Sequence, residues 1–177
     1  MSQMYLYLAA SLDGFIARKD GSLDWLTELP NPDGLDYGYQ TFYEGIDTVL
    51  MGRGTYQEIL SFGVDWPYAD CQSWILSRQQ DLDLPTPHTH QLTHLTPESL
   101  GSLRQNSQKG IWVVGGGQVI SQLLQLDAID QLILSYAPIL LGDGIPLVAR
   151  PGKETPLRLI DTQQYPNGLM TLRYEKG

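Results

Sequence analysis

Two glycine-rich turns, each lying between an apolar run and a helical pattern, constrain the fold of this sequence most strongly. Residues 49–56 read VLMGRGTY, and residues 112–119 read WVVGGGQV. A buried strand that passes directly into a helix is typical of a sheet whose strands run parallel and are connected by helices. The two turns therefore predict an α/β domain.

The rest of the chain extends this pattern. Apolar runs predict strands, and apolar residues at helical spacing predict helices. Strands are expected at 4–10, 48–51, 73–76, 91–95, 111–114 and 129–135, and helices at 36–45, 55–60, from Pro97 onward and at 118–126. Residues 13–31 predict a loop, and runs at 157–160 and 169–174 around Pro166-Asn167-Gly168 predict an antiparallel hairpin. We expect one domain over residues 1–177, with a mostly parallel sheet and an antiparallel C-terminal hairpin.

Composition excludes several classes of partner. The net charge is −9 and the eleven basic residues are scattered, which argues against nucleic acid or an anionic membrane as the main partner. No run of 18 apolar residues predicts a membrane span, and the N-terminus lacks the pattern of a signal peptide. The single cysteine, Cys71, excludes an internal disulfide and a cysteine-rich zinc site, so we expect a cytoplasmic protein.

The two turns also predict a site for an anion. A helix start leaves backbone N–H groups unpaired and carries a partial positive charge, and glycine lets the backbone approach an oxyanion closely. Two such turns suit two phosphates or one dinucleotide. Arg53 adds a full charge and Thr55 a hydroxyl at the first turn. Neither turn is a Walker loop, and the alternative is that each is only a tight turn.

The order of four segments resembles the dihydrofolate reductase superfamily. These segments are LAASLDGFIA at residues 8–17, MGRGTY at 51–56, ILSR at 75–78 and VGGG at 114–117. The sequence is most similar to the branch that includes the reductase domain of riboflavin biosynthesis and its stand-alone relatives, over about residues 4–174. The resemblance implies a three-layer α-β-α fold and a reductase that uses NADP(H) on a small-molecule substrate. It also implies a homodimer, with residues 140–146 near its interface unless they form a plain loop.

The resemblance assigns a set of cofactor-binding residues. The first turn would hold the diphosphate and the adenosine phosphate side, and the second turn would let the diphosphate lie against the next helix. Ser77 and Arg78 would grip the 2′-phosphate and favour NADPH over NADH. Ala9 and Ile16 match positions whose backbone frames the nicotinamide amide. Arg78 has the alternative of being a solvated surface arginine. The full set is Ala9, Ile16, Gly52, Arg53, Gly54, Thr55, Ser77, Arg78, Gly115, Gly116, Gly117, Gln118 and Val119.

Three residues are candidates for the catalytic side. Asp36 matches the carboxylate that holds the substrate and its proton in dihydrofolate reductases, and its alternative is a helix-capping aspartate. Ser135 matches a hydroxyl that hydrogen-bonds that carboxylate. Trp25 matches a tryptophan over the site, and its alternative is core packing.

The sequence also departs from dihydrofolate reductases. Cys71 stands where those enzymes use an arginine to bind the glutamate tail of folate, and Ile120 replaces a tyrosine, so folate is in doubt as the substrate. The leading hypothesis is a reductase of a pterin- or pyrimidine-like heterocycle. A first alternative is the reduction of a ribosylaminouracil phosphate, as in riboflavin synthesis. A second alternative is a non-catalytic module that binds NADPH.

Two further groups of residues could bind a phosphate or a metal. The phosphate of a ribosylaminouracil substrate would need a cation, for which Arg18, Lys19 and Arg150 are candidates. His88, His90 and His94 could suit a divalent metal, but no carboxylate or cysteine completes the site locally. We expect these histidines at a surface or strand edge and no metal.

Overall fold

The computed structural model describes residues 1–149 and 154–177. Its main sheet has eight strands in the order β5-β4-β3-β6-β1-β7-β10-β9. Strands β1 and β3–β7 pair in parallel, and β10 runs antiparallel between β7 and β9. The strands of this sheet are β1 (Gln3–Ser11), β3 (Thr48–Gly52), β4 (Gln72–Leu76), β5 (Thr89–Leu92), β6 (Gly110–Gly115), β7 (Gln131–Ala137), β9 (Leu157–Gln164) and β10 (Met170–Lys176).

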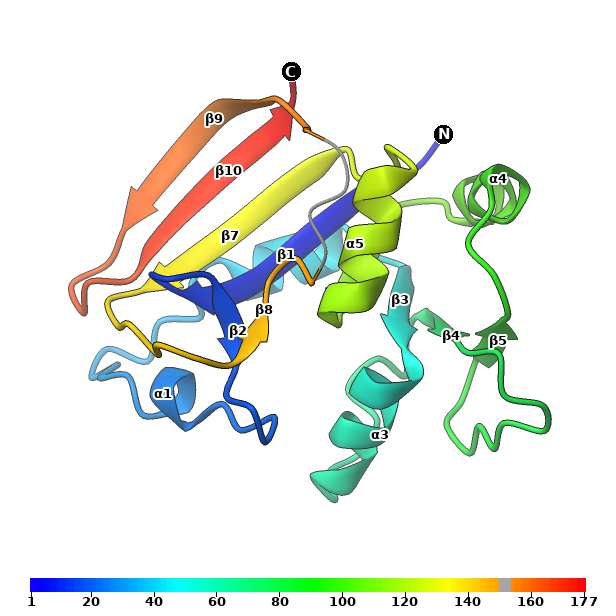
Figure 1. Ribbon diagram of the computed structural model, residues 1–177, viewed down its shortest axis with the longest axis horizontal. Coiled ribbons are helices and arrows are strands. Elements are labelled where there is room, and N and C mark those ends of the chain that lie inside the picture. Colours follow the sequence, from blue (N-terminus) through cyan, green and yellow to red (C-terminus); the bar gives the residue numbers. More distant parts are fainter. Residues whose placement is uncertain (150–153) are drawn as a thin grey trace.

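Helices cover both faces of this sheet (Figure 1). The main helices are α2 (Tyr39–Glu44), α3 (Arg53–Ser61), α4 (Pro97–Asn106) and α5 (Gly117–Gln125). One apolar core packs α4 and α5 on the sheet, and a second, aromatic core packs α2 and α3 on the opposite face. Alternate residues of β1 point into the two cores, since Met4 and Leu6 lie in the first while Tyr5 and Tyr7 contact the second. This three-layer arrangement confirms the predicted fold class.

Several predicted element bounds were wrong by a few residues. The helix predicted at 36–45 begins only at Tyr39, because Asp36 caps its N-terminus from outside. The strand predicted at 91–95 is β5 (Thr89–Leu92), because its parallel pairing with β4 starts at Thr89 opposite Ser73. The helix predicted from Pro97 is α4, and Thr96 caps it in a reciprocal hydrogen-bonded box with Ser99.

The segment predicted as a loop, residues 13–31, contains two short elements. Strand β2 (Phe15–Ala17) pairs antiparallel with β8 (Ile145–Pro146), which lies about 130 positions later in the chain. Helix α1 (Asp24–Thr27) is a single turn that buries Trp25. No local pattern could reveal β2, because its pairing partner is so remote in sequence. Among the described residues, no helix is long and apolar enough to cross a membrane.

Candidate functional site

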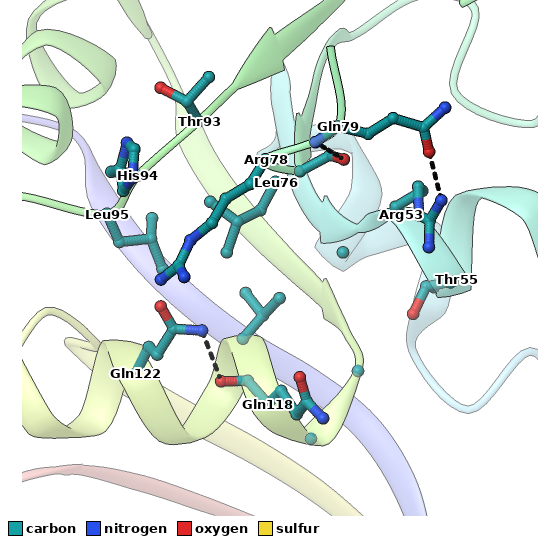
Figure 2. A pocket seen from close by; sticks show the side chains of 16 residues that line it. Arg53, Thr55, Leu76, Arg78, Gln79, Thr93, His94, Leu95, Gln118 and Gln122 are labelled. Carbon is teal, nitrogen blue, oxygen red and sulfur yellow. Dashed lines mark hydrogen bonds between the residues drawn. The ribbon is translucent and has the colours of Figure 1, made fainter. Parts of the chain in front are cut away.

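A cavity of about 770 Å³ lies at the carboxyl ends of four parallel strands, and we call it the upper cavity. Strand β3 leads into it through Gly52 and β6 through Gly116, and the segments that follow β4 and β5 complete its wall (Figure 2). Ligands of open α/β sheets bind at this edge. The residues that line it are Gly52, Arg53, Gly54, Thr55, Leu76, Ser77, Arg78, Gln79, Thr93, His94, Leu95, Gly116, Gly117, Gln118, Val119 and Gln122.

The two glycine turns lie against each other in the lining of this cavity. A Cβ atom on Gly116 would lie 3.4 Å from Thr55 Oγ1, and one on Gly52 would lie 3.2 Å from Val119 Cγ2. Helix α3 follows Gly52 and helix α5 follows Gly116, and neither helix start is capped by a side chain. The first N–H groups of both helices are thus available to one ligand.

The upper cavity is a positive site on an acidic protein. Its lining contains two arginines and one histidine but no aspartate or glutamate. Arg53 donates a hydrogen bond to the side-chain oxygen of Gln79. Arg78 extends across the cavity in the direction of Gln122, and it makes no hydrogen bond or ion pair with any residue in the described part of the chain (Figure 2). An unpaired guanidinium facing a cavity is suited to a phosphate.

A buried hydroxyl lies at the base of Arg78. Ser77 is 8% exposed, and its Oγ accepts a hydrogen bond of 3.1 Å from the backbone N–H of Gln79. The side chain of Gln91 donates to the backbone oxygens of Ser77 and Gln79 and so fixes the segment after β4. These bonds hold the Ser77–Arg78 pair in one backbone conformation.

Most of the residues predicted to bind the cofactor line this cavity, but three do not. Gly115 ends β6 with a φ of +137° and joins Gly116 through a cis peptide bond. Ala9 lines a second cavity instead, and Ile16 lies in β2 and lines neither. Sequence reasoning missed Gln79, Thr93 and Gln122 among others. Thr93 directly follows a parallel strand, and Gln122 lies one helical turn after Gln118. The sequence pattern could therefore have indicated both as lining residues.

A second cavity, of about 290 Å³, lies beyond β1 on the other half of the sheet, and we call it the lower cavity. It adjoins the carboxyl ends of β1 and β7, α1 with the loop after it, and the turn of the hairpin. The predicted residues Asp36 and Ser135 both line it. Its full lining is Tyr7, Leu8, Ala9, Leu26, Thr27, Leu29, Asn31, Asp36, Tyr37, Ser135 and Leu169.

The carboxylate of Asp36 is ionised at neutral pH. Backbone N–H groups of Gln40 and Gly38 each donate to it at 3.0 Å, and these bonds lower the pKa of Asp36. Asp36 therefore caps α2, as one of its two interpretations expected, and also faces the cavity. Burial, with the nearby Tyr165 and the Asp36 charge, raises the pKa of Tyr7 to about 12, so the Tyr7 phenol is neutral.

Two catalytic candidates have surroundings that differ from those the resemblance implied. The hydroxyl of Ser135 pairs with Thr171 Oγ1 at 2.7 Å, where a bond to Asp36 was expected; the antiparallel register places Ser135 directly opposite Thr171. Trp25 is buried with Ala137 and Leu169 and does not line the lower cavity. Its Nε1 atom is buried without a hydrogen-bond partner in the described part of the chain.

The two departures from the dihydrofolate reductase pattern are core residues. Cys71 packs in the aromatic core, and its Sγ lies 3.5 Å from the hydroxyl of Tyr43. Ile120 is fully buried in the core under α5. Neither side chain reaches a ligand cavity, so neither replaces the lost substrate contact.

The three histidines have different surroundings. His88 is exposed before β5, and His90 contacts Gln72 at 3.0 Å and lies over Trp74. His94 lines the upper cavity. Residues 1–149 and 154–177 contain no group of three potential metal ligands close enough to share an ion.

The cations proposed for a substrate phosphate are engaged elsewhere. Arg18 forms a two-bond ion pair with Asp24 at 2.7 and 2.9 Å. Lys19 pairs with Asp143. Arg150 lies outside the described residues.

The fold and the upper cavity together define a class: an α/β domain of the dihydrofolate reductase type with a glycine- and arginine-lined cavity at the carboxyl ends of its parallel strands. The chain belongs to the RibD C-terminal domain family, whose model matches residues 4–171. This finding confirms the family resemblance seen in the sequence.

Individual relatives support the assignment. The chain is 37% identical over 166 residues to the uncharacterized protein YwjB of Bacillus subtilis, covering 90% of each chain. A putative riboflavin biosynthesis protein from Shewanella sp. PV-4 has 30% identity, a TM-score of 0.89 and 99% coverage of both chains. A Thermotoga maritima deaminase/5-amino-6-(5-phosphoribosylamino)uracil reductase shares the fold at 18% identity and a TM-score of 0.70; the match covers 99% of this chain and 57% of the Thermotoga protein.

Proposed function

We propose that this chain is an NADP(H)-dependent reductase that transfers a hydride to a small pyrimidine- or pterin-like heterocycle. The observation that carries the proposal is the upper cavity, where two uncapped helix starts, two arginines and no carboxylate surround one space. Family membership supports the same conclusion, because the matching domain is the reductase half of enzymes such as the Thermotoga protein.

The residues present fit NADPH. The N–H groups at the starts of α3 and α5 would hold the diphosphate, and Ser77 with Arg78 would hold the 2′-phosphate. NADPH supplies the hydride when bound, and the substrate takes one proton as it accepts that hydride. The lower cavity would receive the heterocycle, with Asp36 orienting its N–H groups.

The direct test is a thermal-shift titration with NADPH and NADH side by side, followed by NADPH oxidation with a panel of heterocycles. A ligand at a hundredfold excess over its Kd stabilises the folded state by about 2.7 kcal/mol. We expect a clear shift with NADPH and a smaller one with NADH. No shift with either would refute the cofactor site, whereas binding without turnover of any substrate would favour a non-catalytic NADPH-binding module.

The second candidate activity is the reduction of a phosphoribosylamino-uracil. It is favoured by the family match and by the name of the Thermotoga relative. The homodimer implied by the resemblance stays a prediction, to be checked by light scattering.

A further inference from the structure

The two cavities at the edge of the sheet differ in charge. The upper cavity is lined by two arginines and a histidine and by no acid. The lower cavity has Asp36 as its one charged lining residue, and no lysine, arginine or histidine of the described chain lines it. The charge of the upper cavity therefore attracts a phosphate group, and the charge of the lower cavity repels one.

The negative charge of the lower cavity is fixed. The two backbone N–H groups that donate to Asp36 stabilise its ionised form. The phenol of Tyr7 stays neutral because burial raises its pKa to about 12. The site therefore presents one carboxylate to a bound molecule at neutral pH.

The two cations of the segment between β2 and α1 are already paired. Arg18 is held by Asp24, and Lys19 is held by Asp143. Arg173 lines a neighbouring cavity of about 60 Å³, and Asp161 stands opposite it in the β9–β10 pairing. Arg18 and Lys19 are therefore paired, whereas Arg173 makes no ion pair in the described part of the chain and lies outside the lining of the lower cavity.

The rest of the lining of the lower cavity is uncharged. Leu8, Leu26, Leu29 and Leu169 contribute apolar surface, and Thr27 and Asn31 add neutral polar groups. A volume of about 290 Å³ lies just below the range for small-molecule pockets, roughly 300–1,000 Å³, so the cavity suits a small ring.

We propose, building on the reductase function above, that the substrate of the lower cavity is an unphosphorylated nitrogen heterocycle that presents N–H donors to Asp36. The phosphate groups of the reaction would then belong to the cofactor alone. The inference separates this chain from a reductase that needs a phosphoribosyl substrate.

The experiment compares matched pairs of compounds that differ only by one phosphate. The first pair is 5-amino-6-(ribosylamino)uracil and its 5′-phosphate. The others are a pterin with a hydroxyl group and a purine-type nucleoside, each with its phosphate monoester. NADPH oxidation gives kcat/KM for each compound, and thermal shift of the NADP⁺-saturated protein gives binding. We expect the unphosphorylated member to be favoured at least about tenfold, because a phosphate would lie near a carboxylate in a cavity that no cation of the described residues lines.

Two variants make the comparison specific. Thr27 is an exposed residue of the lining, so Thr27→Lys introduces a cation with little effect on the core. We expect Thr27→Lys to raise the phosphorylated-to-unphosphorylated ratio of kcat/KM, and the matched variant Thr27→Gln to leave that ratio unchanged. Asp36→Asn is expected to raise the affinity for the phosphorylated member relative to that for the unphosphorylated member.

The possible failures are distinct. Equal or better use of the phosphorylated member by the unmodified protein would overturn the proposal, and so would the absence of binding by every pair in a protein that binds NADPH. Failure to bind NADPH would instead refute the proposed function. Preference for the unphosphorylated member in binding, even without turnover, would support the substrate class.

Discussion

The backbone oxygen of Pro146 lies 2.6 Å from the position that a Cβ atom on Gly117 would occupy. Pro146 ends the short strand β8, which pairs with β2, and Gly117 is the first residue of α5. The third glycine of the triple-glycine turn is therefore required by contact with another segment of the protein. Of the first two glycines, Gly116 lies near Thr55 in the lining of the upper cavity, and Gly115 forms the bend with a positive φ.

Replacing Gly117 should destabilise the protein. Gly117→Ala forces β8 or the start of α5 to move, and such overpacking typically costs about 1–3 kcal/mol. The matched control is Gly101→Ala in α4, where nothing lies within 4 Å and a gain of about 0.5–1 kcal/mol is expected. Urea unfolding of both variants measures the effect. Equal stability of the two variants would contradict the packing role.

Local sequence patterns predicted the parts of the fold that are themselves local. The glycine turns, the capped helix at Thr96 and the C-terminal hairpin all depend on residues close in sequence, and the structure has each of them. The β2–β8 pairing joins segments far apart in sequence, so no local pattern could reveal it.

The candidate site was predictable to the same extent. Residues at the carboxyl ends of parallel strands meet at one edge, so the turns after β3, β4 and β6 could be grouped in advance. The partner of Ser135 could not be, because it depends on the register between β7 and β10. The spacing of the three histidines likewise does not show that only His94 faces a cavity.

Arg78 should set the preference for NADPH over NADH. Its guanidinium faces the upper cavity without a partner among the described residues, so Arg78→Gln should weaken NADPH binding about tenfold to a hundredfold. The affinity for NADH, which lacks the 2′-phosphate, should not change. Isothermal titration with both cofactors measures this, and Arg158→Gln on the outer strand β9 is the control. An equal loss for both cofactors would show that Arg78 binds another part of the molecule.

Asp47 should make stability dependent on pH. Burial acts to raise its pKa, but hydrogen bonds from the hydroxyl of Ser107 at 2.7 Å and the N–H groups of Gln108 and Lys109 at 2.7 and 3.0 Å hold the pKa below its usual value. Because the folded-state pKa is lowered, the stabilisation is present above the unfolded pKa of about 3.9 and is lost as pH falls through the folded value.

The corresponding variant is Asp47→Asn. At pH 7 it should lose about 1–2 kcal/mol of unfolding free energy, a modest figure because the carboxylate is partly exposed. The difference from the unmodified protein should shrink below about pH 4. Denaturant unfolding across pH measures it, with the exposed Asp65→Asn as the control. A difference that is constant down to pH 2.5 would exclude this titration.

Asn167 should position the wall of the lower cavity. Its side-chain amide donates to the backbone oxygen of Pro30 at 2.9 Å and to the hydroxyl of Tyr37 at 2.8 Å, which ties the hairpin turn to the loop around the cavity. Asn167→Ala should raise KM for the heterocycle about fivefold, as expected for a lost hydrogen bond of about 1 kcal/mol. The affinity for NADPH should stay the same, since the upper cavity is built from other segments. A fall in kcat with unchanged KM would argue against a positioning role.

Asp36 should control turnover without affecting the cofactor. Asn can accept from only one of the two N–H groups that Asp36 binds, and it carries no charge to orient a donor-rich ring, so Asp36→Asn should lower kcat/KM by about a hundredfold or more. The NADPH shift in melting temperature should persist, which separates loss of chemistry from loss of folding.

Because the N–H groups of Gln40 and Gly38 lower the pKa of Asp36, activity of the unmodified protein should hold from neutral pH down to about 4 and fall only where the carboxylate becomes protonated. In Asp36→Asn this acid limb should be absent from the residual rate. Full activity in the variant, or an unchanged acid limb, would leave Asp36 as the cap of α2 alone.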